Sequence, residues 1–214
     1  MNLSSDNNTL LEKMESWILP DNKIIIGIDG YSGAGKTTLA QSIEKRSDVF
    51  LVVNRDDFAI PRKEFADSFT KLKTEVEKVR LLVNNTIDVD ELASFLKMYK
   101  NTNDKIAWRV RDGVSGLKDK QKIFDFSKKV LIIEGIFLFH SRKLQELIDK
   151  KIFIDTNIEL ADNRRRAREM DKWGNDYFPD TRPDSYSRLI KLGFIDYLNN
   201  ERPMNQADLV IISS

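Results

Sequence analysis

Hydrophobic residues along this chain fall into short runs that alternate with longer segments of helical periodicity. Five runs are rich in Ile, Val and Leu and are bounded by polar or turn residues, which is typical of buried strands; they lie at 23–28, 50–53, 130–133, 151–154 and 209–212. Helical spacing of apolar residues is found at 9–18, directly after residue 37, at 158–170 and at 184–198. This alternation predicts an α/β fold with a five-stranded parallel sheet and helices on both faces.

The segment between the second and third predicted strands departs from simple alternation. Residues 62–100 are polar and helical in pattern, with an interruption near Asn84 and Asn85. Residues 105–110 and 120–124 flank a Gly-containing stretch and predict a hairpin that projects from the body. No repeat or low-complexity linker divides the chain, so we expect residues 1–214 to form one domain, with the hairpin inserted at about 105–124.

Composition excludes several kinds of site. The chain has no cysteine and only one histidine, His140, so thiol chemistry, disulfides and multi-histidine metal sites are excluded. The formal net charge of +1 gives no reason to expect a nucleic-acid partner. No apolar stretch approaches the ~18 residues of a membrane span, and the polar N-terminus is unlike a signal peptide. We therefore expect a cytoplasmic protein without a membrane partner, and a homo-oligomer stays open.

Residues 30–37 match the phosphate-binding pattern GxxxxGK[ST] in full. In such a loop glycines let successive backbone N–H groups converge on phosphates, the lysine adds a charge, the hydroxyl ligates Mg²⁺, and the next helix adds its dipole. The alternative, an ordinary Gly-rich turn, is disfavoured by the strand before and the helix after. The candidate nucleotide-binding residues are Gly30, Ser32, Gly33, Ala34, Gly35, Lys36, Thr37 and Thr38.

Two further patterns bear on what the nucleotide is used for. GTPases carry a guanine-reading Asn-Lys-x-Asp, whereas Asn22 and Lys23 are followed by two isoleucines. Mechanical ATPases usually place Asp-Glu after a hydrophobic strand, whereas 130–133 leads to the single carboxylate Glu134. Phosphoryl transfer is therefore favoured. A nucleotide-dependent switch protein that transfers nothing is the alternative from another class.

Acidic residues lie at the ends of two predicted strands. Asp56 and Asp57 follow the strand at 50–53, and Glu134 follows the strand at 130–133. Ligands of open α/β sheets bind at this edge. A kinase needs one carboxylate to orient and deprotonate the acceptor hydroxyl and another to help hold Mg²⁺. The alternative for the Asp pair is a cap of the helix that follows Pro61.

A cluster of arginines lies on the helix predicted after the fourth strand. Helical geometry places Arg164, Arg165 and Arg168 on a shared face, with Arg166 pointing away. Mobile cations on a lid helix could neutralise a migrating phosphoryl group. The alternative is a solvated face with ion pairs between successive turns. We expect a lid at about 158–175.

Taken together, these residues resemble the uridine kinase family and its relatives, namely phosphoribulokinase, bacterial pantothenate kinase and nicotinamide riboside kinase. The resemblance runs from about residue 23 to the end of the chain. The matching motifs are Gly33-Ala34-Gly35-Lys36-Thr37, Arg55-Asp56-Asp57-Phe58, Ile133-Glu134-Gly135-Ile136, 152–156 followed by the arginines, and Ala207-Asp208-Leu209-Val210-Ile211.

The resemblance implies a P-loop NTPase fold with ATP and Mg²⁺ as cofactors. It implies Asp56 as the general base, with Lys36 also catalytic. Thr37, Asp56 and Glu134 are implied to organise Mg²⁺, directly or through water. In the lid, Arg165 and Arg168 are implied to be catalytic and Arg164 to bind the nucleotide.

The departures from the family pattern lie at residues 110–116, the acceptor segment that the resemblance implies. Uridine-cytidine kinases carry Val-Tyr-Asp-Phe…His there, whereas this chain has Arg111 in place of the Tyr and Gly116 in place of the His. The family's Asp-His-Pro signature is also missing between Phe58 and Asp88. We expect a small-molecule hydroxyl acceptor, with a nucleoside as the leading class. A nucleoside-like vitamin, such as nicotinamide riboside or pantothenate, is the alternative.

Overall fold

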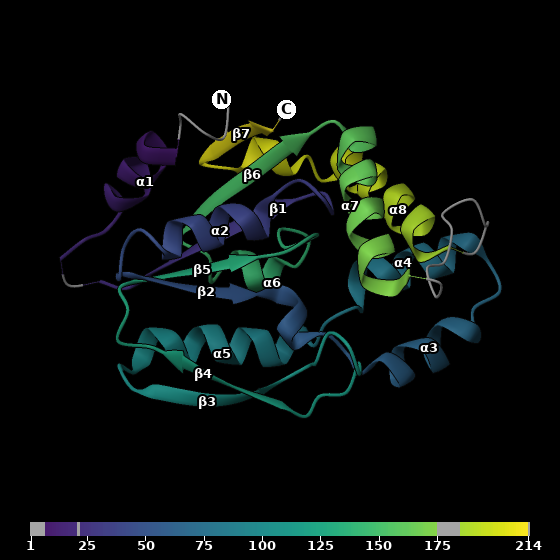
Figure 1. Cartoon of the computed structure of the whole chain (residues 1–214), viewed down its shortest axis with the longest axis horizontal. Coiled ribbons are helices and arrows are strands. Elements are labelled where there is room, and N and C mark those ends of the chain that lie inside the picture. Colours follow the sequence, from purple (N-terminus) through teal and green to yellow (C-terminus); the bar gives the residue numbers. More distant parts are fainter. Residues whose placement is uncertain (1–6, 21, 175–184, 214) are drawn as a thin grey trace.

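A five-stranded parallel sheet forms the centre of the computed structural model, which describes residues 7–20, 22–174 and 185–213 (Figure 1). Its strands are β1 (Ile24–Gly30), β2 (Phe50–Asn54), β5 (Val130–Glu134), β6 (Lys150–Thr156) and β7 (Leu209–Ser213), in the order β2-β5-β1-β6-β7. All neighbouring pairs are parallel. The predicted fold class and all five strands are confirmed, and β1 lies in the middle of the sheet.

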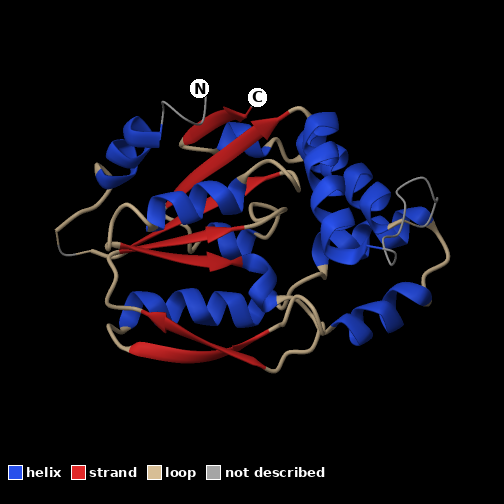
Figure 2. Cartoon of the chain, in the orientation of Figure 1, coloured by secondary structure: helices blue, strands red, loops and turns tan. Residues whose placement is uncertain are grey.

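Helices cover both faces of this sheet (Figure 2). Side chains alternate along each strand, so Ile26 and Ile28 join a core cluster on one face while Ile25 joins the cluster on the other. The first face is covered by α1 (Asn7–Glu15) and α2 (Lys36–Glu44), and the second by α5 (Val89–Asn101), α6 (Arg142–Gln145) and α8 (Tyr186–Asn200). The near-continuous apolar runs of the strands follow from this double burial.

The polar helical segment after β2 contains one more break than its sequence pattern predicts. It forms the short η1 helix (Arg55–Phe58), then α3 (Arg62–Thr70), α4 (Glu75–Asn84) and α5. The break near Asn84 is confirmed. The additional break precedes Thr74, whose hydroxyl accepts a hydrogen bond from the Glu77 N–H while the Glu77 carboxylate accepts one from the Thr74 N–H. This reciprocal cap starts a new helix.

The predicted hairpin consists of β3 (Lys105–Val110) and β4 (Lys120–Asp125), paired antiparallel. The expectation that it projects from the body is wrong, because its inner face packs on α5. The Phe95 ring of α5 makes edge contacts with Trp108 of β3 and Phe124 of β4, at centroid distances of 5.1 and 4.9 Å. Alternating apolar residues give the hairpin a face that is favourable to bury.

The C-terminal part begins with α7 (Ile158–Trp173), capped by Asn157, whose side-chain oxygen accepts hydrogen bonds from two backbone N–H groups of the first turn. The final residue of the predicted lid, Asn175, lies outside the described residues, as does the predicted start of the next helix at Asp184. A short η3 helix (Pro203–Gln206) leads into β7. No helix in the described ranges has the length and apolar character that crossing a membrane requires.

Candidate active site

The carboxyl ends of β1, β2 and β5 lie side by side and bring polar residues to one edge of the sheet. Asn54 at the end of β2 is the register partner of Glu134 at the end of β5, and Ile28 of β1 pairs with the same residue. A cavity of about 680 Å³ opens at this edge. The predicted residues that line it are Ser32, Gly33, Gly35, Lys36, Thr37, Thr38, Asp56, Glu134, Arg164 and Arg168. Gly30, Ala34 and Arg165 are not among its lining residues.

The loop between β1 and α2 is held against the lid helix. Gly33 has a φ of +88°, and a Cβ built there would lie 2.2 Å from the Ala161 carbonyl oxygen of α7. Only glycine allows both this backbone conformation and this approach. Ala34, within the loop, is fully buried, and its N–H donates to the Tyr31 carbonyl at 3.1 Å.

The Lys36 ammonium is folded back onto this loop. It is 8% exposed and donates hydrogen bonds to the carbonyl oxygens of Gly30 at 2.9 Å and Tyr31 at 2.8 Å. Burial lowers its pKa, and the nearby Glu134 carboxylate opposes that shift. Lys36 is among the residues that line the cavity, so the loop places its amino group there.

Asp29, which sequence reasoning did not single out, anchors the start of the loop. It is fully buried and accepts hydrogen bonds from the Gly30 N–H at 2.6 Å, the Phe139 N–H at 3.0 Å and the Tyr197 hydroxyl at 2.7 Å. Burial raises its pKa. The sequence signal for Asp29 is an acidic residue at the end of an apolar strand. A carboxylate in this position is expected to be buried, and a buried carboxylate needs several hydrogen-bond donors.

Glu134 lies at the centre of a small polar network. It is 2% exposed, and its Oε1 accepts hydrogen bonds from the Thr37 hydroxyl at 2.9 Å and the Asn54 amide at 2.7 Å. Burial raises its pKa, and the charge of Lys36 opposes this. Asn54 is a second residue that the sequence reasoning missed; its only signal is a polar side chain at the end of a buried strand.

The structure gives the two neighbouring aspartates different surroundings. The Asp56 side chain is 66% exposed, lines the cavity, and lies 3.8 Å from the Arg55 guanidinium. Its N–H donates to the Asn54 side chain at 2.7 Å, which caps η1. Asp57 is buried and accepts two hydrogen bonds from Lys122 of the hairpin. Only Asp56 is presented to the cavity.

The structure also separates the three lid arginines, rather than presenting them on one face. Arg164 and Arg168 line the cavity. The buried Arg165 guanidinium instead pairs with Glu169 at 2.8 Å and donates to the Ser187 hydroxyl of α8 at 2.6 Å. Because α7 packs between the phosphate loop and α8, residues at adjacent positions point to different neighbours.

Residues 110–116, in which the sequence departs from the family pattern, lie beside the acid pair. The Arg111 N–H donates to the Asp57 carbonyl at 2.9 Å, and the Asp112 carboxylate caps the N–H groups of Val114 and Ser115, both at 2.8 Å. The Gly113 carbonyl accepts a hydrogen bond from Lys172 of α7 at 3.1 Å. The tip of the hairpin is therefore in contact with the end of α7.

Comparisons with known proteins agree with this arrangement. A family model described as the phosphoribulokinase/uridine kinase family matches residues 25–213. A uridine kinase from Chlamydia pneumoniae is 34% identical over 157 residues, covering 71% of this chain and 66% of that protein. One from Borreliella burgdorferi (strain ZS7) is 26% identical over 187 residues, covering 87% and 85%.

A solved structure of a possible uridine kinase from Bacillus stearothermophilus matches with a TM-score of 0.70 and 19% identity, and the match covers 98% of both chains. At this identity the likeness concerns the fold alone. The chain therefore belongs to the phosphoribulokinase/uridine kinase family and is an ATP-dependent kinase that acts on a hydroxyl group of a small molecule.

Proposed function

We propose that this kinase transfers the γ-phosphate of ATP to a hydroxyl group of a nucleoside, with Asp56 as the general base. One observation carries the proposal: the exposed carboxylate of Asp56 shares a cavity with Lys36, Thr37 and Glu134. Phosphoryl transfer depends mainly on positioning and on charge neutralisation, and these residues supply both.

Lys36 and the loop amides would bind the phosphates of ATP. The Lys36 ammonium donates to two loop carbonyls, and a phosphate oxygen would take the place of these acceptors. Arg164 and Arg168 face the same cavity from α7 and would balance the charge of the transferring group. Arg165, engaged with Glu169 and Ser187, would act by positioning the lid helix.

The donor set fits Mg²⁺. Thr37 Oγ1 and Glu134 Oε1 lie 2.9 Å apart, and Asp56 lines the same cavity, so three hard oxygen ligands are available. No group of three or more His, Cys, Asp or Glu side chains gathers anywhere in the described ranges, which fits an ion held partly by substrate phosphates and water. When bound, Mg²⁺ would neutralise charge on the phosphates.

Asp56 would orient the acceptor hydroxyl and accept its proton. Its carboxylate is exposed to the cavity while its backbone is held by the Asn54 side chain, so the side chain is available on a fixed support. A base must come within hydrogen-bond reach of the proton it removes, and the solvated edge of the cavity gives a hydroxyl access to this carboxylate.

The names of the relatives support a nucleoside as the acceptor, since both are uridine kinases. The acceptor segment supports low selectivity among nucleosides. Arg111 and Gly116 replace the ring and the imidazole that read a pyrimidine, and strong discrimination requires buried polar groups that a wrong substrate leaves unpaired.

The test is a kinase assay with ATP and a panel of nucleosides, nicotinamide riboside and pantothenate, reported as kcat/KM. We expect several nucleosides to be phosphorylated, with uridine preferred by less than about tenfold. Selective use of uridine or cytidine would show that other residues read the base. Use of a vitamin alone would replace the nucleoside, and slow ATP hydrolysis unaffected by every hydroxyl compound would contradict transfer.

A further inference from the structure

Tyr31, a residue of the phosphate loop, contacts both the loop lysine and the lid helix. Its carbonyl oxygen accepts a hydrogen bond from the Lys36 ammonium at 2.8 Å, and its hydroxyl donates to the Asp162 carboxylate of α7 at 2.9 Å. The side chain is fully buried, and its ring lies 4.8 Å from the Phe194 ring of α8. A single residue of the loop therefore connects Lys36 to α7 and α8.

The phosphate-binding pattern does not require a tyrosine at this position. In GxxxxGK[ST] the residue after the first glycine can be of any type, because the loop contacts phosphates through its backbone N–H groups. A phenylalanine would fill the same apolar space beside Phe194 without the cost of burying a hydroxyl. The contact that distinguishes tyrosine from phenylalanine here is the hydrogen bond to Asp162.

The Asp162 carboxylate is held by groups from three elements. Besides the Tyr31 hydroxyl, it has the Arg165 guanidinium of α7 at 3.5 Å and the Lys191 ammonium of α8 at 3.0 Å. The two cations compensate the charge of a carboxylate that is largely buried. Hydrogen bonds to a carboxylate are also stronger than those between neutral groups. The loop is therefore joined to a well-fixed point between α7 and α8.

A second contact joins the loop to the same part of α7. The close approach of Gly33 to the Ala161 carbonyl oxygen lies one residue before Asp162. Arg164 and Arg168, which line the cavity, follow Asp162 within two turns of the same helix. The contacts of the loop with Ala161 and Asp162 therefore help to set where these arginines lie relative to Lys36.

We propose that Tyr31 is a positioning residue for phosphoryl transfer, whose hydroxyl acts through Asp162 to hold the lid arginines in a fixed arrangement with Lys36. The inference rests on the roles proposed above for Lys36 and Arg168. Their cations come from separate elements, and electrostatic catalysis requires that both be in place before charge develops. Without the hydroxyl ATP still binds, but the cations fit the transferring group less well, so the loss falls on kcat rather than on KM.

Steady-state kinetics of Tyr31→Phe with ATP and uridine test the proposal. We expect kcat to fall about tenfold, with the KM for ATP changed less than about twofold. The double variant Tyr31→Phe/Arg168→Ala should lose less than the product of the two single effects, because the tyrosine acts through the lid. An unchanged kcat in Tyr31→Phe, or single effects that simply multiply, would overturn the proposal.

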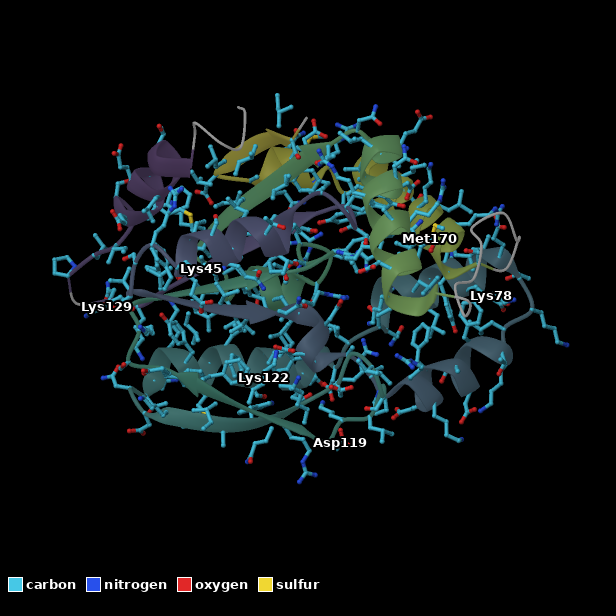
Figure 3. All side chains as sticks on the ribbon, in the orientation of Figure 1. Lys45, Lys78, Asp119, Lys122, Lys129 and Met170 are labelled. Atoms are coloured by element: carbon cyan, nitrogen blue, oxygen red, sulfur yellow. The ribbon has the colours of Figure 1, made fainter. Side chains whose placement is uncertain are left out.

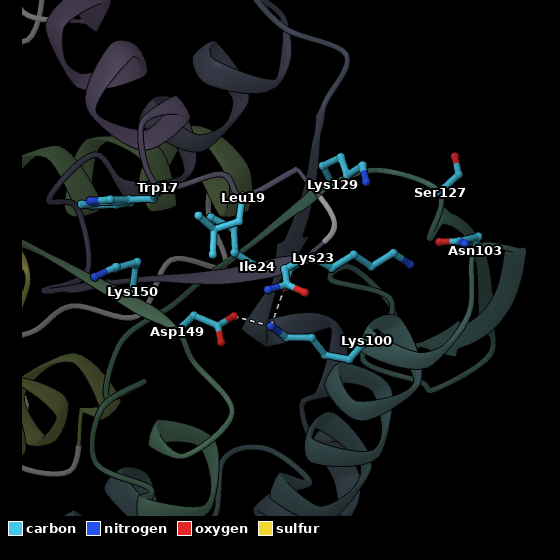
Figure 4. A pocket seen from close by; sticks show the side chains of 11 residues that line it. Trp17, Leu19, Lys23, Ile24, Lys100, Asn103, Ser127, Lys129, Asp149 and Lys150 are labelled. Atoms are coloured by element: carbon cyan, nitrogen blue, oxygen red, sulfur yellow. Dashed lines mark hydrogen bonds and ion pairs between the residues drawn. The ribbon is translucent and has the colours of Figure 1, made fainter.

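The matched control is Tyr99→Phe, which also removes a buried hydroxyl. The Tyr99 hydroxyl of α5 donates to the Lys128 carbonyl at 3.1 Å. The adjacent Lys100 and Lys129 line a separate cavity that shares no residue with the active-site cavity (Figure 4). Lys129 lies at the end of the molecule far from Met170 of the lid helix (Figure 3).

Both phenylalanine variants should lower the thermal midpoint by a similar amount, about 4 °C or less, since each loses one buried hydrogen bond. Only Tyr31→Phe should lower kcat. An equal loss of kcat in Tyr99→Phe would show that the kinetic effect follows from stability alone, and would overturn the positioning role.

A further readout needs no acceptor. ADP with aluminium fluoride and Mg²⁺ imitates the transferring phosphoryl group, and Tyr31→Phe should bind this mimic about tenfold more weakly while a non-hydrolysable ATP analogue is affected less than about twofold. Equal weakening of both would contradict positioning. If Arg168→Ala lowers kcat while Tyr31→Phe changes neither kcat nor mimic binding, this inference fails and the proposed function stands. If uridine is not phosphorylated but Tyr31→Phe weakens the mimic alone, the nucleoside proposal fails and this inference stands.

Discussion

Lys122 of β4 donates hydrogen bonds to both carboxylate oxygens of Asp57, at 2.6 and 2.8 Å. This ion pair connects the hairpin to the residues that follow β2. Both carboxylate oxygens of Asp57 accept hydrogen bonds from Lys122. The carboxylate of its neighbour, Asp56, stays exposed at the cavity. Two adjacent residues of the same type therefore have different roles, one in anchoring the hairpin and one in the site.

The first prediction separates these roles by nearly isosteric substitutions. Asp56→Asn should leave the thermal midpoint near the wild-type value and reduce kcat by about 10²-fold or more, because the amide cannot accept the proton of the acceptor. Asp57→Asn should retain most of kcat but lower the free energy of unfolding by about 1–3 kcal/mol, because Lys122 loses its charged partner. Steady-state kinetics and denaturant unfolding measure the two effects. An inactive Asp57→Asn beside an active Asp56→Asn would reverse the assignment.

The second prediction concerns Glu134→Gln, which keeps an oxygen able to accept from Thr37 and Asn54 but removes the charge. Burial raises the pKa of Glu134 above its ordinary value of 4.5. The Glu134 carboxyl group therefore binds its proton more tightly in the folded state than in the unfolded chain. The contribution of Glu134 to the free energy of unfolding should therefore decrease as pH rises from about 4.5 through the raised folded value. The glutamine does not titrate, so the variant should gain stability relative to the wild type over that window.

Denaturant unfolding across this pH range, with chelator present to exclude metal, measures the difference. At neutral pH the variant should be folded, yet kcat/KM should fall by about 10²-fold because the proposed Mg²⁺ ligand has lost its charge. A stability difference that does not change with pH would contradict the raised pKa. Full activity of the variant would show that Glu134 has no part in the reaction.

The third prediction is that Lys36→Ala abolishes turnover in a folded protein. The variant loses the charge that would follow the γ-phosphate, and we expect kcat to fall by on the order of 10²-fold or more. The control is Lys45→Ala, which removes an exposed lysine at the end of the same helix. Circular dichroism checks the fold of both variants. If Lys36→Ala kept the wild-type kcat, the phosphate loop would have no part in the reaction.

The fourth prediction distinguishes two arginines of the lid helix. Arg168→Ala should reduce kcat with little change in thermal stability, because its side chain lines the cavity. Arg165→Ala should lower the thermal midpoint by several degrees, since it removes a buried guanidinium that links Glu169 of α7 to Ser187 of α8. Thermal unfolding and kinetics on both variants decide the matter. A stable but inactive Arg165→Ala variant would instead assign a catalytic role to Arg165.

Much of the fold can be predicted from local patterns. The strands are continuous apolar runs because helices cover both faces of the sheet. The spacing of Gly30, Gly35 and Lys36 predicts the phosphate loop. The break before Thr74 was missed because a helical pattern continues on both sides of it, although the reciprocal pairing with Glu77 marks it. The hairpin was correctly located, but nothing local shows that it packs on α5.

The candidate site likewise contains some residues that the local sequence predicts and others that it does not. The position of Asp56 beyond a buried strand, and of Thr37 after the loop lysine, is set by residues adjacent in sequence. Asp29 and Asn54 were not predicted, because their importance comes from partners far along the chain: Tyr197 for Asp29 and Glu134 for Asn54. The strand order places Glu134 beside Asn54, and the packing of α8 on the sheet brings Tyr197 to Asp29. Neither arrangement can be read from a single segment of the sequence.

The sequence by itself therefore determined the fold class, the phosphate loop and the family, since these depend on periodicity, on backbone requirements and on motifs of neighbouring residues. Only the tertiary structure decided which of two adjacent aspartates faces the cavity and which lid arginines do. Lys122 is 65 residues from Asp57, and Ser187 is 22 from Arg165. A side chain takes its role from the partner that satisfies its charge, and chain folding, rather than local pattern, selects that partner.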